Sequence, residues 1–86
     1  MEDLIRKVAK NDERQFLREF LFDLLSPAEY REVAVRWQII KMLKNGENHR
    51  EIAKKLKVSV ATTMRGSKEL SNKKGGFNAA WNKYYK

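Results

Sequence analysis

The segment from residue 49 to 70 constrains the fold more than any other part of the chain. It reads HREIAKKLKVSVATTMRGSKEL, in which Ile52 and Leu56 share one face of a short helix and a turn at Lys57–Ser59 leads into a second helix. Two helices joined by a turn of three or four residues are typical of a helix-turn-helix, whose second helix enters the major groove of DNA. The sequence therefore predicts a helix-turn-helix over about residues 48–70.

Helical patterns also run through the rest of the chain. From residue 13 to 25, seven of thirteen positions are apolar, so this helix should be covered on two sides, the second cover being another subunit. Ser26-Pro27-Ala28-Glu29 is a capping box that starts a helix, and Asn45-Gly46 ends it with a left-handed C-cap. The whole chain is predicted to be one small all-α domain over residues 1–86.

The tail over about residues 76–85 repeats aromatic residues at helical spacing: Phe77, Trp81, and Tyr84 or Tyr85. Such a stripe is typical of the core face of a terminal helix, and we adopt that interpretation. Aromatic side chains interleaved with lysine also suit stacking on single-stranded bases, so this alternative stays open.

Charge is unevenly distributed along the chain. The formal net charge is +8, yet residues 1–33 hold six Lys/Arg against eight Asp/Glu, whereas residues 34–86 hold thirteen against three. A segment with such an excess of cations attracts a polyanion, in binding that weakens strongly with salt. The plainer alternative is that the lysines only keep a small protein in solution.

The second helix of the predicted motif would present its first exposed side chains to base edges, where short apolar groups suit thymine methyls. Neighbouring cations, Arg65 included, would contact phosphate and fix the register. The residues predicted to contact DNA are Arg50, Lys54, Lys55, Lys57, Val60, Ala61, Thr62, Met64 and Lys68.

Two residues fit the motif less well, and a bundle of two short amphipathic helices remains the structural alternative. Lys57 occupies the turn position where glycine is commonest, and a left-handed conformation costs a non-glycine residue about 1 kcal/mol. Thr63 stands where an apolar residue would anchor the second helix.

Other classes of protein find little support in the sequence. The chain has no cysteine and no long apolar run, and its charged start is unlike a secretory signal, so we expect a cytoplasmic protein without a membrane span. His49 is the only histidine and is expected at the exposed start of its helix. No phosphate-binding glycine loop or apolar carboxylate pair is present, so we expect no catalytic residue, metal site or prosthetic group.

Several short runs together resemble the tryptophan repressor family, most specifically Ala61–Ser67, where the family has Ala-Thr-x-x-Arg-Gly-Ser. The resemblance covers residues 20–71 well. It implies an all-helical, intertwined homodimer that binds a palindromic operator in double-stranded DNA when L-tryptophan lies beside each recognition helix. The other matching runs are Leu25-Ser26-Pro27 with Glu29, Arg36, Ile39-Ile40, Leu43, Gly46 and Arg50-Glu51-Ile52.

The resemblance also implies an effector site. By position, Arg36 and Arg65 would sandwich the indole ring, and Arg65 with Ser26 would hold the carboxylate. Guanidinium groups suit both tasks, because they stack on rings and pair with carboxylates. Thr62 and Gly66 would line the same pocket. Ser26 is also expected to cap the helix that begins at Pro27, and the two roles are compatible.

Glu69 is the departure from the family pattern that bears most on the effector, because the family has a serine there, near the ligand amino group. A carboxylate at this position can pair with a ligand ammonium, or it can neutralise Arg65 one helical turn away. Asp23 replaces a leucine at the pocket rim, and Met64 replaces a threonine on the base-reading face.

Three functions remain open at this point. The first is a DNA-binding transcription regulator, expected to be a repressor, under the control of tryptophan or a related effector. The second is an effector-independent DNA-binding protein of the same fold. The third is a small module that binds RNA or another protein.

Overall fold

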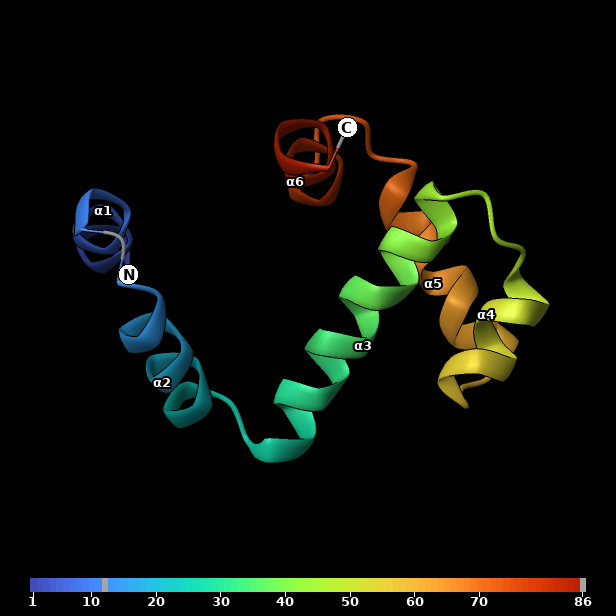
Figure 1. The fold of residues 1–86 in the computed structure, drawn as a ribbon, viewed down its shortest axis with the longest axis horizontal. Coiled ribbons are helices and arrows are strands. Elements are labelled where there is room, and N and C mark those ends of the chain that lie inside the picture. Colours follow the sequence, from blue (N-terminus) through green and yellow to red (C-terminus); the bar gives the residue numbers. More distant parts are fainter. Residues whose placement is uncertain (12, 86) are drawn as a thin grey trace. The chain divides into compact units, whose positions relative to one another are not determined.

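The computed structural model describes residues 1–11 and 13–85, and these form six α-helices and no strand, which confirms the all-α class (Figure 1). Contacts divide the chain into two compact units, Met1–Glu32 and Val33–Lys86, with the boundary inside the third helix. A single domain over residues 1–86 stays a prediction. The helices are α1 (Glu2–Asn11), α2 (Arg14–Leu24), α3 (Pro27–Lys44), α4 (His49–Leu56), α5 (Val60–Leu70) and α6 (Gly76–Tyr84).

The first unit, made of α1, α2 and the start of α3, has little core of its own. No side chain described in it is buried. Phe22 stacks on Tyr30 with ring centroids 4.2 Å apart, and yet it remains half exposed. Within the described residues of this unit, α2 therefore lacks the predicted cover on two sides. The large apolar side chains of α2 that are 40–57% exposed are Phe16, Leu17, Phe22 and Leu24.

Hydrogen bonds between residues close in sequence define both ends of α3, as predicted. At its start, the Ser26 Oγ accepts a hydrogen bond from the Glu29 N–H at 3.1 Å, and Glu29 Oε1 accepts one from the Ser26 N–H at 2.8 Å. At its end, Gly46 has φ +86° and donates its N–H to the Leu43 carbonyl at 3.0 Å. The capping box and the left-handed C-cap are both confirmed.

The core of the second unit brings α3, α4 and α5 together. Gly66 is the point at which α5 lies directly on α3: a Cβ at this position would be 2.8 Å from Ile39 Cγ2 and 3.7 Å from Ile40 Cδ1. Ile39 is only 1% exposed, and its Cγ2 sits on a branched Cβ that cannot turn aside freely. The buried residues of these helices are Ile39, Ile40, Ile52, Ala53, Thr63 and Gly66.

We expect Gly66→Ala to lower the free energy of unfolding by about 1–2 kcal/mol. Overpacking typically costs about 1–3 kcal/mol, and the better helix propensity of alanine returns at most about 1 kcal/mol. Denaturant unfolding measures the change. Ser67→Ala, at the exposed neighbouring position, is the control that gains helix propensity without the clash. In an Ile39→Ala background, which removes Cγ2, the cost of Gly66→Ala should shrink; an undiminished cost would contradict the packing explanation.

The capping box also predicts a pH dependence. The hydrogen bond from the Ser26 N–H, followed by the interaction with the Ser26 side chain, holds the pKa of Glu29 below its usual value. A carboxyl group whose pKa is lowered by folding stabilises the folded state above its unfolded pKa, and this contribution is lost as the pH falls through the folded pKa. In Ser26→Ala the backbone donor remains, so an NMR titration should find the Glu29 pKa raised only part of the way. An unchanged pKa would show that the Ser26 hydroxyl takes no part.

Candidate nucleic-acid interface and small-molecule cavity

A three-residue turn, Lys57–Ser59, connects α4 to α5. Lys57 has φ 58° and ψ 45°, which is the left-handed conformation expected at a position where glycine is commonest. The Val58 N–H donates to the Ala53 carbonyl at 3.0 Å and closes the end of α4. Three residues thus connect the two helices, and Lys57 adopts a conformation that is unfavourable for a residue other than glycine.

Side-chain caps define the start of both helices. Asn48 Oδ1 accepts a hydrogen bond from the Glu51 N–H at 2.9 Å, at the start of α4. The Ser59 Oγ accepts one from the Thr62 N–H at 3.1 Å, at the start of α5. Each cap satisfies a backbone donor that the helix leaves unpaired.

The first turns of α5 expose most of the residues predicted to reach base edges. Val60 and Met64 are 41% and 57% exposed, and Ala61 is exposed as well. Thr62 is partly buried, and its hydroxyl lies 2.9 Å from that of Ser59. The exposed side chains at this end of α5 are therefore mainly small and apolar, apart from the longer and more flexible side chain of Met64.

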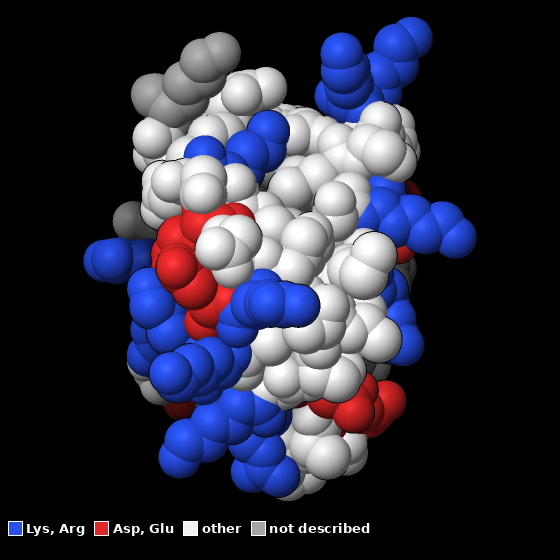
Figure 2. Space-filling model, turned by 90° about the vertical axis from the view of Figure 1, so that its right-hand side faces the viewer, with Lys and Arg blue, Asp and Glu red and all other residues white. Residues whose placement is uncertain are grey.

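Cations predicted to contact phosphate are exposed on the same two helices and on the turn between them. Figure 2 shows the side of the molecule on which α4 lies, where lysine and arginine side chains project at several places and acidic side chains lie among them. Lys55 is engaged within the protein: its Nζ lies 2.6 Å from Glu47 Oε1, and this hydrogen bond and the carboxylate charge raise the Lys55 pKa. The exposed cations of α4, the turn and α5 are Arg50, Lys54, Lys55, Lys57, Arg65 and Lys68.

One polar contact joins the two helices, and the sequence did not predict it. His49 Nδ1 lies 2.8 Å from the hydroxyl of Thr63, which is fully buried and donates its own proton to the Val60 carbonyl at 2.7 Å. The expectation that His49 stands exposed is wrong, because the ring is partly buried against this hydroxyl. Thr63 is buried at the position where an apolar residue would anchor α5, and its hydroxyl is fully hydrogen-bonded there.

The direction of these hydrogen bonds predicts the tautomer of His49. A hydroxyl has a single proton to donate, so the Thr63 oxygen, having given its proton to Val60, must accept one from Nδ1. The neutral ring of His49 should therefore carry its proton on Nδ1, which long-range ¹H–¹⁵N NMR spectra report directly. Thr63→Val is the matched variant in which the constraint on the ring is absent. A proton on Nε2 in the unaltered protein would contradict the assignment.

A cavity of about 580 Å³ opens among α3, the end of α5 and α6. Trp37 and Phe77 are stacked against each other in its wall, with ring centroids 6.0 Å apart. This volume and the largely apolar, aromatic lining are typical of small-molecule sites. The residues that line it are Val33, Arg36, Trp37, Glu69, Asn72, Gly75, Gly76, Phe77 and Ala80.

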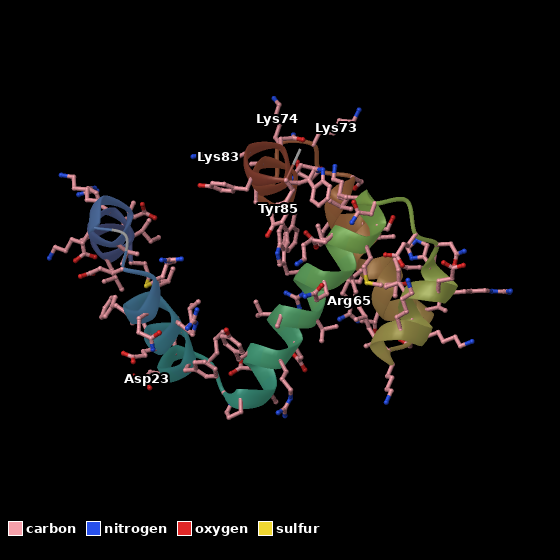
Figure 3. The ribbon with its side chains drawn as sticks, in the orientation of Figure 1. Asp23, Arg65, Lys73, Lys74, Lys83 and Tyr85 are labelled. Atoms are coloured by element: carbon pink, nitrogen blue, oxygen red, sulfur yellow. The ribbon has the colours of Figure 1, made fainter. Side chains whose placement is uncertain are left out.

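Asn78 connects α6 to the end of α5, and so fixes two of the helices that line the cavity relative to each other. Its buried side-chain amide donates to the carbonyl of Leu70 at 2.9 Å and to that of Asn72 at 3.0 Å. At the other end of α6, the Tyr85 ring meets Trp37 edge to face at 5.7 Å, and Figure 3 shows Tyr85 on the side of α6 that faces α3. The aromatic tail is thus packed against α3 of its own chain.

The structure brings together only some of the predicted effector residues. Arg36 and Glu69 both line the cavity. Arg65 is exposed on α5 and is not among the lining residues, Gly66 is buried against Ile39, and Thr62 lies beside Ser59. Ser26 belongs to the first unit, where it caps α3.

Two lining residues, Trp37 and Phe77, were not predicted as parts of a site. Phe77 was assigned to the core face of a terminal helix, and nothing in the sequence indicated that this face would meet Trp37 beside an open volume. The aromatic spacing of the tail was the available signal, but it carries no information on the partner of the stripe.

The described residues, 1–11 and 13–85, hold no helix that is long and apolar enough to cross a membrane. Nor do the histidine, aspartate and glutamate side chains in that part of the chain form a cluster of three or more that could hold a metal ion.

The described residues form a small all-helical protein in which a three-residue turn joins two short helices, α4 and α5. The chain belongs to the Trp repressor protein family, which it matches over residues 1–84. Trp operon repressor homologs of Chlamydia trachomatis serovars D and A are 41% identical to it over 63 residues, which is 72% of this chain and 67% of theirs. No solved structure matches the chain. The resemblance inferred from the short sequence runs is confirmed.

Proposed function

We propose that this protein is a sequence-specific repressor of transcription that binds double-stranded DNA through α4 and α5, arranged as a helix-turn-helix. The observation that carries the proposal is the exposed start of α5 next to the left-handed turn at Lys57, together with the exposed cations of α4, the turn and α5. Membership of the Trp repressor protein family and the similarity to Trp operon repressor homologs support it.

In this proposal α5 is the recognition helix. Val60, Ala61 and Met64 offer apolar contacts to thymine methyls, and the Thr62 hydroxyl offers a hydrogen bond to a base edge. Arg50, Lys54, Lys57 and Lys68 neutralise phosphates and fix the register of the helix. Lys55 contributes fully only after it leaves Glu47, so its contribution is smaller than that of its neighbours.

The repressor acts as a homodimer, formed through the first unit. The exposed apolar side chains of α2 support this part of the proposal, because burial of such a surface is the main driving force for association. A symmetric dimer places two recognition helices on the two halves of a palindromic operator, about one helical turn of DNA apart.

A small effector, tryptophan or a related molecule, occupies the cavity beside α5. Arg36 and the aromatic wall of Trp37 and Phe77 suit an indole ring that carries a carboxylate. A ligand that binds one orientation of α5 better than others shifts the protein toward that orientation. The effector-independent alternative relied on an ion pair between Arg65 and Glu69, and the described residues show no such pair.

Gel shifts on duplexes selected from a random library test the DNA-binding half of the proposal. Affinity should fall with salt at a slope of about −0.9 per phosphate neutralised, and Lys54→Ala should weaken all duplexes alike and flatten the slope by about 1. Met64→Ala should weaken only the selected sequences. Lys83→Ala, which removes a cation from α6, is the matched control and should change little. Equal affinity for single strands would contradict the proposal.

The same gel shifts with and without L-tryptophan test the effector half. Tryptophan should raise the affinity for the selected duplex several-fold, and Arg65→Ala should abolish this response if Arg65 moves in to hold the ligand. Strong duplex binding that tryptophan leaves unchanged would support DNA binding alone.

A further inference from the structure

The cavity beside α5 combines an aromatic wall with two opposite charges. Arg36 reaches it from α3 and Glu69 from the last turn of α5, while Trp37 and Phe77 supply the rings. A ligand that satisfies both charges carries a cationic group, an anionic group and an aromatic body.

Both charged side chains are available to a ligand. The part of the chain that the structure describes contains no ion pair of either Arg36 or Glu69. The lysines nearest in sequence to Glu69 beyond the helix, Lys73 and Lys74, point away from α3 in Figure 3. Among the described residues, the carboxylate of Glu69 in the cavity wall therefore has no ion-pair partner.

The end of α5 adds to the negative potential at this point. Glu69 is the residue before the last of α5, where the helix dipole places its partial negative charge. Of the carbonyl oxygens there, that of Leu70 is engaged by the amide of Asn78, which is neutral and cancels no charge. A cationic group at this end of the cavity is thus favoured by the carboxylate and by the helix terminus together, and an anionic group is disfavoured by both.

We propose that Glu69 makes this cavity selective for aromatic ligands that carry an ammonium group, so that loss of the ammonium from a ligand weakens binding more than loss of its carboxylate. Arg36 favours a carboxylate, from the α3 side, which makes an aromatic amino-acid zwitterion the best occupant. The inference rests on the effector half of the proposed function and specifies its ligand class.

Calorimetric titration of the full chain with four probes tests the inference: L-tryptophan, tryptamine, indole-3-propionate and indole. Tryptophan and tryptamine should bind more tightly than indole-3-propionate, which lacks the ammonium. In Glu69→Gln, which keeps the size of the side chain, the affinity for tryptamine should fall by about tenfold, because a hydrogen bond to a charged acceptor is lost. The affinity for indole-3-propionate should rise in the same variant.

Two further variants separate this effect from a general change in charge. Glu51→Gln removes an equal charge from exposed α4 and should leave all four affinities unchanged. Ala80→Leu fills part of the cavity and should weaken every probe, which locates the binding site.

The outcomes distinguish the inference from the function on which it rests. Indole-3-propionate binding as tightly as tryptamine, or a Glu69→Gln effect equal for all probes, would overturn the inference and leave tryptophan control standing. The absence of binding by any probe would overturn both. The gel shifts without ligand decide the DNA-binding half independently of these titrations.

Discussion

The contact between α5 and α3 at Gly66 is the constraint on which the rest of the second unit depends. Without a side chain at this position, α5 lies directly on Ile39 and Ile40, and the opposite face of the same helix, with Val60 and Met64, is left exposed. A larger residue would push α5 outward and displace that exposed face together with the end of the helix that borders the cavity. One close approach therefore positions both candidate functional surfaces.

The family pattern assigns Gly66 to the effector pocket, whereas its surroundings give it a role in packing. The two roles concern the same helix: the cavity lies at the end of α5, and the exposed side chains predicted to contact bases lie at its start. An 11-residue helix is a rigid element, so in the proposed function a ligand bound at one end of α5 would affect the position of the other end. The close contact of Gly66 with Ile39 lies between the two ends.

Sequence reasoning succeeded where the determining interactions are local. The capping box at Ser26 and the left-handed conformation of Lys57 both depend on residues within four positions of one another. It failed at His49, because the hydroxyl that holds the ring is fourteen residues away on another helix. The cavity escaped prediction for the same reason, since its walls come from three helices whose packing no local pattern encodes.

The attachment of α6 has a consequence for how such a protein can change over evolutionary time. Both hydrogen bonds of the Asn78 amide end on backbone oxygens, so they do not depend on which side chains stand at positions 70 and 72. Substitutions at the exposed start of α5 leave these backbone atoms in place. In the proposed function, operator preference can therefore change by mutation at one end of α5 while the cavity at its other end keeps its structure.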